Sequence, residues 1–360
     1  MQDLKVYDGS GWQSLKGPPG PSAVSADAGN TLKLGGDGLH FTTAPPDSDS
    51  YVWCKSGDDI SARYKAAAAL TPNGLPLAAD NRATLFVLPG FYEVAVFDRD
   101  FVDVYGLGQA PLRPAVIIQD SAVTVRGNDI RISGIGTTLN FGGVPTPGQV
   151  FINCSSGDTS WNGNAPGTYI QCQAGANSFG GGQFSTGATG VFIDCVAGNT
   201  SFGTRSASGT FIRCTGGLGS FASGYDASGV FIDCTGGNSS FGGGAVSRPG
   251  IASGRFLRCR AGTKSFGAGR NATSIGSSSG TFIDCEGGAE SSFLSTISGS
   301  YTRCLFGPRS LTGSTITSSA RFLWCSAPDG SFTADWRDSV EPGAILKHCI
   351  GDGYSEINYP

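Results

Sequence analysis

Charged residues, histidine and long apolar runs are scarce in this chain, and each scarcity excludes a class of function. Only 14% of the 360 residues are charged and the formal net charge is −4, which argues against nucleic acid as a main partner. The two histidines, His40 and His348, lie far apart in sequence, so we expect neither a Ser-His-Asp triad nor a histidine metal site. No stretch approaches the ~18–20 apolar residues of a membrane span.

The first residues also lack the apolar core of a signal peptide. We therefore expect synthesis in the cytoplasm, no membrane insertion and no cofactor or metal.

Glycine and cysteine, by contrast, are abundant, and the cysteines mark a repeat. The chain has 57 glycines and 11 cysteines. A unit of 18 to 26 residues cannot bury its own apolar face and must stack on its neighbours. Ten cysteines end a short apolar strand of the type Phe-Ile-Asp-Cys at these intervals: Cys154, Cys172, Cys195, Cys214, Cys234, Cys259, Cys285, Cys304, Cys325 and Cys349.

The repeat is typical of strands rather than helices. It is rich in Phe, Ile, Gly, Ser and Thr, and glycine flanks the strand on both sides. Seven residues after most of the cysteines stands an aromatic preceded by serine, as in Ser201-Phe202 and Ser240-Phe241. A strand, a glycine turn, a second strand and a return of variable length make one coil. The sequence therefore predicts an all-β fold, a single-stranded parallel β-helix or solenoid.

Side-chain alternation along a strand predicts which residues face inward. In Phe282-Ile283-Asp284-Cys285, Ile and Cys share one face while Phe and Asp share the other. A buried column of charges would cost much free energy, so we expect Ile and Cys inside, with Phe and the charges outside. The charged position alternates in sign along the coils, which favours in-register stacking: Asp194, Arg213, Asp233, Arg258, Asp284 and Arg303.

This assignment leaves an aromatic stripe on the outside, and soluble proteins rarely expose so long an apolar strip. We expect other copies of the chain to cover it in a homotrimer, and the alternative is a return loop of the same chain. The cysteines are expected to be small buried thiols, because their spacing fits neither a zinc motif nor C-x-x-C. The predicted trimer contacts are Phe192, Phe211, Phe231, Phe256, Phe282 and Phe322.

The N-terminal part differs from the repeats and carries a resemblance. A hairpin is predicted at residues 5–12, GPPGPS follows at 17–22, and a glycine-rich run occupies 25–39. This order resembles the particle-attachment regions of bacteriophage tail fibres and tailspikes. Residues 83–92 and the alternating strands after them resemble the first coils of pectate-lyase-like right-handed β-helices.

One helix is expected, from Asp59 to Leu70, with Asp58 or Asp59 as its N-cap and a stop at residues 72–74. It is well placed to cap the open end of the β-helix and protect that edge. We divide the chain into an attachment region with a collagen-like linker (1–46), a linker with the capping helix (47–80), the β-helix (81–350) and a C-terminal tail (351–360).

The resemblance implies a virion tail protein that recognises host surface polysaccharide and mediates adsorption. Its N-terminal region would attach to a phage tail or baseplate protein. Aromatic faces beside polar groups suit sugar binding, so ligand contacts are expected at Trp336, Asp335 and Asp338, with Trp161 as a second choice.

Two other functions stay open. Tailspikes similar to this architecture often cleave polysaccharide with paired carboxylates, which glycoside hydrolysis needs about 5–10 Å apart. Asp335, Asp338 and Glu341 are the candidate catalytic residues, and a solvated acidic loop is the plainer interpretation. Glu286 and Glu290 are interpreted as turn surface. The third possibility is a structural connector whose C-terminal end docks another tail protein.

Overall fold

The computed structural model divides the chain into two compact units, Met1–Asp47 and Ser48–Pro360. It describes four strands within residues 5–41, and residues 47–360 except 109–113, 120, 144, 162, 182–186, 244–248, 269–274, 293–294, 328–339, 352–353 and 360.

The described strands of the first unit form two antiparallel pairs. β1 (Lys5–Tyr7) pairs with β2 (Trp12–Ser14), which is the predicted hairpin. β3 (Leu32–Gly35) pairs with β4 (Gly38–Phe41).

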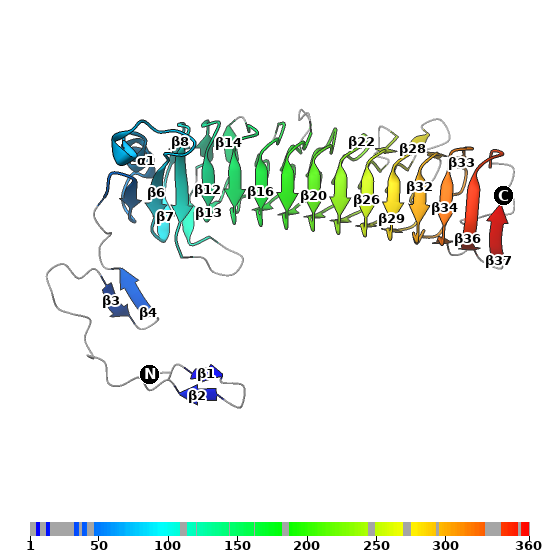
Figure 1. Cartoon of the computed structure of the whole chain (residues 1–360), viewed down its shortest axis with the longest axis horizontal. Coiled ribbons are helices and arrows are strands. Elements are labelled where there is room, and N and C mark those ends of the chain that lie inside the picture. The colour runs from blue at the N-terminus through cyan, green and yellow to red at the C-terminus, as the bar shows by residue number, and fades with distance from the viewer. Residues whose placement is uncertain are drawn as a thin grey trace. The chain divides into compact units, whose positions relative to one another are not determined.

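The second unit is a parallel β-solenoid, as the repeat predicts (Figure 1). Its longest sheet takes one strand from each successive coil, and neighbouring strands pair in parallel and in register. These strands are β5 (Tyr51–Cys54), β6 (Ala83–Val87), β9 (Val102–Gly106), β12 (Arg131–Ser133), β15 (Val150–Ile152), β16 (Thr168–Ile170), β18 (Val191–Ile193), β20 (Thr210–Ile212), β23 (Val230–Ile232), β26 (Arg255–Leu257), β29 (Thr281–Ile283), β32 (Ser300–Thr302), β34 (Arg321–Leu323) and β36 (Ile345–Gly351).

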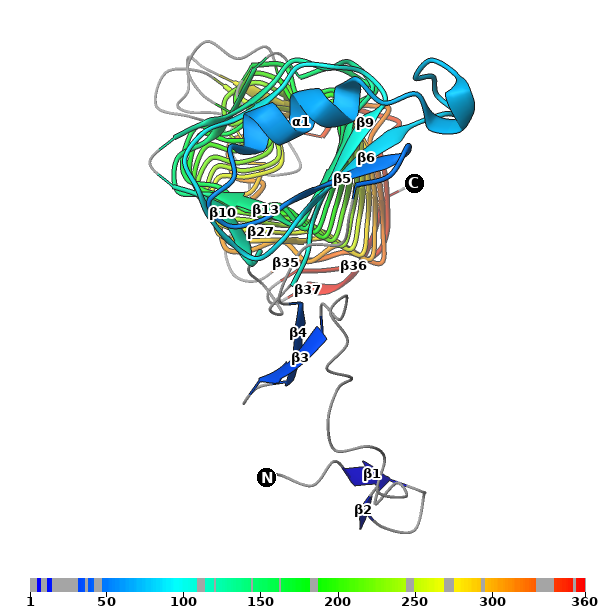
Figure 2. The ribbon, with the colours of Figure 1, turned by 90° about the vertical axis from the view of Figure 1, so that its left-hand side faces the viewer.

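Shorter parallel sheets form the other walls (Figure 2). In the first coils these are β7 (Gly90–Tyr92), β10 (Val116–Ile118) and β13 (Ile135–Thr137), and β8 (Ala95–Phe97), β11 (Val123–Val125) and β14 (Phe141–Gly143). In the repeats they are β17 (Gln173–Ala174), β19 (Val196–Ala197), β21 (Thr215–Gly216), β24 (Thr235–Gly236), β27 (Arg260–Ala261) and β30 (Glu286–Gly287), and β22 (Asp226–Ala227), β25 (Ile251–Ala252), β28 (Gly276–Ser278), β31 (Ser295–Ile297) and β33 (Thr315–Ile316).

Both ends of the long sheet differ from the expected boundaries. β5 pairs in parallel with β6, so the sheet begins upstream of residue 81. At the other end β36 pairs in parallel with β34 and with the short strand β35 (Ser326–Ala327). It also pairs antiparallel with β37 (Tyr354–Tyr359), so a strand lies in the segment that we expected to be a tail.

The helix α1 (Ile60–Ala68) is present, with Asp59 as its N-cap. The Asp59 carboxylate accepts hydrogen bonds from the backbone N–H groups of Ser61 and Ala62, at 2.8 and 3.1 Å. Ile60, Tyr64 and Ala67 are buried, and the helix packs against β5, β6 and β8. A single 3-10 turn (Pro72–Gly74) follows.

The predicted orientation of the repeat is wrong for two of its four positions. Every phenyl group of the predicted trimer contact lies inside the coil: Phe192, Phe211, Phe231, Phe256, Phe282 and Phe322 are at most 1% exposed. The isoleucines lie on the outer face with intermediate exposure, while the cysteines are buried and the charged residues point outward, as expected. The aromatic stripe therefore belongs to the core of one chain and cannot be the contact between copies.

A left-handed corner residue causes this difference. The residue between Ile and Cys has a positive φ in every copy, from 51° to 60°, so β18 ends at Ile193 and the chain turns at Asp194. Alternation breaks at that corner, which allows Phe192 and Cys195 both to point inward. The backbone hydrogen bonding between coils nevertheless continues through the turn, because Asp194 N–H donates to the Ile212 carbonyl at 2.9 Å.

Two parallel aromatic stacks fill the interior of the repeats. Within each stack ring centroids are 4.6 to 5.3 Å apart and planes lie within 8° of parallel. Across the two stacks the rings meet edge to face, as for Phe211 and Phe221 at 5.5 Å and 89°. The first stack is Phe151, Tyr169, Phe192, Phe211, Phe231, Phe256, Phe282, Tyr301 and Phe322; the second is Phe141, Trp161, Phe179, Phe202, Phe221, Phe241 and Phe266.

Buried serines and cysteines line the same interior and satisfy backbone groups. Ser160 N–H donates to Ser178 Oγ at 3.2 Å, and the contact recurs one coil later between Ser178 and Ser201. The Cys195 thiol donates to the Tyr169 carbonyl at 3.3 Å. All eleven cysteines are free and buried, which confirms the predicted thiol column. These polar contacts hold the coils in step without placing a charge in the core.

The first coils are filled differently, with aliphatic side chains and one buried ionic cluster. In β6 alternate residues point inward, so Leu85 and Val87 are buried. Arg82 makes a bidentate ion pair with Asp103 at 2.6 and 2.9 Å and reaches Asp129 at 2.8 Å. Burial alone would lower the pKa of Arg82, but the hydrogen bonds and charges of Asp103 and Asp129 outweigh it and raise that pKa.

Candidate interaction surface

Three of the predicted ligand contacts, Trp336, Asp335 and Asp338, lie outside the described residues. Of the predicted catalytic group only Glu341 is described. It is exposed, and its carboxylate accepts a hydrogen bond from the Ser318 N–H at 3.0 Å.

Trp161, the second choice for ligand contact, is part of the core. Only 2% of it is exposed, because its ring is stacked between Phe141 and Phe179 at 4.7 and 4.8 Å. The expectation that Trp161 contacts a ligand is therefore wrong. Its position seven residues after Cys154 matches the Ser-Phe position of the other coils, and this sequence signal was enough to place it inside.

Glu286 and Glu290 each form ion pairs with residues of neighbouring coils. Glu286 lies 3.3 Å from the Arg260 guanidinium on the surface. Glu290 contacts Lys264 at 3.4 Å and also pairs with Arg309. Both glutamates link adjacent coils, which agrees with their interpretation as surface residues.

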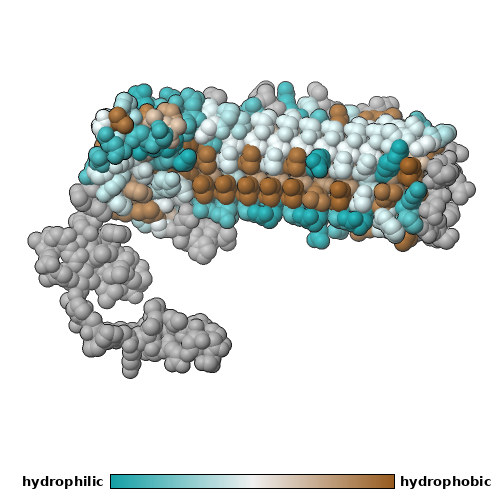
Figure 3. All heavy atoms as spheres, in the orientation of Figure 1, coloured by the Kyte–Doolittle hydropathy of each residue, from teal (hydrophilic) through white to brown (hydrophobic). Residues whose placement is uncertain are grey.

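Among the described residues, an extensive and partly exposed feature is a row of mainly apolar side chains on the outer face of the long sheet, which we call the outer ladder. Figure 3 shows the outer ladder of the middle coils as a hydrophobic row, with a hydrophilic row beside it. Consecutive members face each other in register across the parallel strands. The outer ladder comprises Trp53, Phe86, Tyr105, Ser133, Ile152, Ile170, Ile193, Ile212, Ile232, Leu257, Ile283, Thr302 and Leu323, all with intermediate exposure.

A second column runs beside the outer ladder, two residues earlier in each strand. In the repeats it starts as an alternation of Val and Thr and acquires arginine near the C-terminal end. Val191 and Ile193 in β18, for example, point to the same outer side of the sheet. The second column contains Val150, Thr168, Val191, Thr210, Val230, Arg255, Thr281, Ser300 and Arg321.

The alternating charges form a ladder of three ion pairs on the other side of the outer ladder, which we call the charge ladder. Arg213 binds Asp194 of the preceding coil through two contacts at 2.6 and 2.8 Å. Arg258–Asp233 and Arg303–Asp284 repeat the geometry at the same distances. The hydrogen bonds from each arginine lower the pKa of the three aspartates. The predicted charge stacking is thus confirmed, and the charge ladder carries no net charge.

Aromatic rings replace the charges at the C-terminal end of the same corner. Trp324 is 59% exposed and stacks on His348 at 4.0 Å and 12°. Leu305, which forms a bridge to Ser326 of β35, and Ile350 of β36, which also pairs with Ser326, are exposed as well. This group is an exposed aromatic site that the sequence patterns did not single out.

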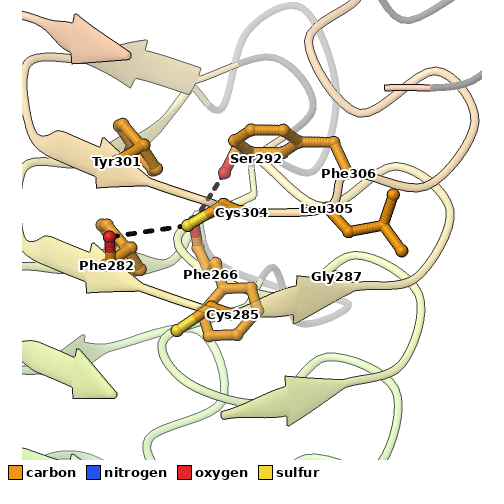
Figure 4. Close-up of a pocket in the computed structure, with 9 residues that line it drawn as sticks. All are labelled: Phe266, Phe282, Cys285, Gly287, Ser292, Tyr301, Cys304, Leu305 and Phe306. Atoms are coloured by element: carbon orange, nitrogen blue, oxygen red, sulfur yellow. Dashed lines mark hydrogen bonds between the residues drawn. The ribbon is translucent and has the colours of Figure 1, made fainter. Parts of the chain in front are cut away.

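The described part of the solenoid offers little room for a small ligand in its interior. A hollow of about 10 Å³ lies where Ser292 stands in place of the usual phenyl group (Figure 4). Phe306 of the next coil fills most of that space, at 5.7 Å from Tyr301. Ser292 Oγ donates to the Phe266 carbonyl at 3.1 Å. A volume of one water molecule holds no sugar or cofactor.

A larger, open hollow of about 580 Å³ lies beside the N-terminal end of α1. Its lining combines the carboxylates of Asp58, Asp59 and Glu93 with the exposed side chains of Phe91 and Val94. Asp59 is engaged as the N-cap of α1, and Asp58 accepts a hydrogen bond from Lys55 N–H at 3.0 Å. Two of the three carboxylates therefore serve the local fold.

Cofactor and membrane signals can be judged for the described residues alone. Among them, no group of three or more His, Cys, Asp or Glu side chains is arranged to hold a metal ion. Burial raises the pKa of the Cys172 and Cys214 thiols. No helix in this part of the chain has the length and apolar character needed to cross a membrane.

Sequence reasoning missed the outer ladder because it placed the isoleucines inside. A signal was present: Asn153, Asp194, Asp233 and Asp284 occupy the corner, and Asn and Asp tolerate the left-handed conformation better than most residues. The arginines at the same position in other coils concealed it, because arginine has no such preference.

A scan against protein-family models, a search of curated proteins and a search of solved structures each found no match.

Proposed function

We propose that the protein is a rod-shaped component of a virion tail, a tail fibre or short tailspike, that binds host surface polysaccharide and mediates adsorption. Uninterrupted in-register stacking from β5 to β36 supports this proposal most directly, because it builds a stiff spacer rather than an enclosed reaction chamber. The resemblance of the N-terminal segments to particle-attachment regions supplies the virion end.

In this proposal the parts of the chain divide the work. Residues 1–46 attach the protein to a tail or baseplate protein, and α1 caps the first coil against pairing with other strands. The coil is right-handed, as in pectate-lyase-like folds, and three copies form each fibre. Weak contacts to a repetitive polysaccharide then add up through multivalency to firm attachment. The sugar contacts are Trp336, Asp335 and Asp338.

Adsorption of the purified full chain to capsular and lipopolysaccharide preparations tests the proposal. Retained binding without product release supports a fibre. We expect Trp336→Ala to weaken binding by about tenfold or more, equivalent to about 1.4 kcal/mol. Trp161→Phe is the matched control, because Trp161 lies in the core and the other coils carry Phe at its position; its binding should be unchanged. Failure to bind any preparation, together with binding to a tail component, would favour the connector.

The same samples distinguish the depolymerase, for which the exposed Glu341 is the one described candidate. New reducing ends or unsaturated products from the wild type, abolished in Glu341→Gln, Asp335→Asn or Asp338→Asn, would establish cleavage. In that case the protein would be a depolymerase that cleaves the polysaccharide by hydrolysis or elimination, rather than a fibre that only binds it.

A further inference from the structure

We infer that a second copy of this chain covers the outer ladder, so that rods associate side by side through the outer face of the long sheet. This inference deepens the proposed function, because it names the surface through which the copies meet. The outer ladder takes the place of the phenyl stripe as the expected contact between copies, because the phenyl rings are buried inside each coil. It does not depend on polysaccharide binding.

The first argument is the extent of the apolar surface. From Trp53 to Leu323 the outer ladder rises about twelve steps of about 4.8 Å, or roughly 58 Å, with Ser133 and Thr302 as its two polar members. The second column widens the strip to about 10–14 Å over the eight steps from Val150 to Arg321, so that the whole strip covers on the order of 500–650 Å². That is most of the ~800 Å² that each partner contributes to a stable protein–protein interface. Exposed apolar patches of this size mark interaction sites on soluble proteins.

The second argument is the period of the surface. Each coil contributes one rung in register with the next, as Ile193↔Ile212 and Ile212↔Ile232 show. A surface corrugated at about 4.8 Å fits along its whole length only a partner with the same period. An identical solenoid has that period by construction, whereas a globular partner would match only a few rungs.

The third argument is the charge at the border of the strip. Asp194, Asp233 and Asp284 are each neutralised by an arginine of the next coil in bidentate geometry. Two such borders approach each other without net repulsion, while a strongly anionic or cationic partner finds no complementary field. The border formed by the charge ladder therefore favours an uncharged, self-similar surface as the occupant, whereas the other border carries Arg255 and Arg321 near the C-terminal end.

The test is the molar mass of the full chain by light scattering, compared with two variants. Ile212→Arg places a charge in the middle of the outer ladder, and Thr215→Arg adds the same charge on β21 of the same coil, where the side chain is exposed. We expect a multimer for the wild type and for Thr215→Arg. Ile212→Arg should dissociate at concentrations at least about tenfold higher than the wild type, because burying an unpaired charge opposes association. An unchanged multimer in Ile212→Arg would overturn the inference.

Cross-linking gives a second measurement that does not require a disruptive variant. All native cysteines are buried, so Ile212→Cys introduces an accessible thiol on the outer ladder. Mild oxidation should give covalently linked copies with Ile212→Cys and few or none with the control Thr215→Cys. Equal cross-linking of both, or of neither, contradicts the inference.

The outcomes separate this inference from the proposed function. A wild-type chain that is monomeric overturns the side-by-side contact, and adsorption of that monomer to polysaccharide still decides whether it is an adhesin. A multimer that ignores all polysaccharide preparations supports the contact and removes the adhesin.

Discussion

The first coils and the repeated coils share one backbone path but fill it in opposite ways. From β5 to β13 the core is mainly aliphatic, alternate residues of β6 point inward and outward, and an ion cluster around Arg82 joins the coils. From β15 to β34 the strands of the long sheet are short, a left-handed corner residue follows each of them, and stacked rings, thiols and serines repeat in columns. One topology thus accepts either an irregular core or a ladder core.

The comparison shows that the repeats are stabilised by columns of equivalent side chains, whereas the first coils depend on contacts between individual residues. In the first coils Arg82 contacts Asp103 and Asp129 in an arrangement that the described neighbouring coils do not repeat. In the repeats each ring has two near-identical neighbours, so a substitution at one position changes the packing in the coils before and after it. We expect the two regions to respond differently to substitution, as follows.

The largest effect is expected for truncation of a stacked ring. Phe231 stacks on Phe211 and Phe256 at 4.9 and 4.8 Å and is fully buried. Phe231→Ala should destabilise the fold by about 3–5 kcal/mol, because it leaves a cavity in both stacks. Chemical or thermal unfolding measures the loss. Phe86→Ala on the outer face is the control, and a similar cost for both variants would contradict the assignment of inner and outer faces.

The ion pairs of the two regions should differ next. Arg82→Ala leaves Asp103, which is 4% exposed, without its bidentate partner, and should cost about 3–5 kcal/mol. Arg258→Ala also removes a bidentate ion pair, but from the solvent-exposed charge ladder, and its effect on the unfolding midpoint should be far smaller. Equal shifts in the two unfolding midpoints would contradict the expectation that the buried ion pair stabilises the fold more than the exposed one.

The left-handed corners predict an intermediate effect that the straight strands of the first coils lack. Gln171 has a φ of 53° on the surface. Gln171→Val should cost about 1–2 kcal/mol, because a β-branched side chain clashes with the backbone in this conformation. Gln171→Gly should leave the stability unchanged or raise it. If the valine variant is as stable as the glycine variant, the corner does not have the left-handed geometry.

The smallest effect is expected from acid titration of the charge ladder. Arginine partners lower the folded-state pKa of Asp194, Asp233 and Asp284 below the unfolded value of about 3.9. Their contribution is therefore complete above about pH 4 and is lost as the pH falls through the lowered pKa. The triple Asp→Asn variant should lose less stability than the wild type between pH 5 and pH 2. The measurement is the free energy of unfolding of both proteins as a function of pH. The same loss of stability in the two proteins would contradict the prediction.

Much of the fold could be predicted from the sequence, because the same residue types recur at equivalent positions of successive coils. Ten cysteines at short intervals required stacked coils, and the sign alternation from Asp194 to Arg303 required parallel register. The alternation rule is obeyed in β6, where Leu85 is buried while Phe86 lies outside. It fails after Ile193, because one left-handed residue resets the direction of the next side chain.

The outer ladder, which we propose as the contact between copies, could not be predicted, for the same reason. A single misjudged dihedral angle at each corner exchanged Phe and Ile between the inside and the outside, so the expected contact was assigned to side chains that are buried. Ser292 and Phe306 show a related limit: the ring displaced from one column reappears in the next coil at a position where other coils carry Gly or Ala, such as Gly216. Such compensation depends on volume, which no local pattern encodes.

Identical cross-sections also make the length of the molecule adjustable. Because each coil meets the next through the same columns, two whole coils, such as residues 196–234, can be removed or duplicated with the rings, thiols and alternating charges still in step. The length of the solenoid then changes in increments of about 9.6 Å, two coils of about 4.8 Å each. A chain with this architecture can therefore change its length by whole pairs of coils, while the coils at its two ends keep their sequence.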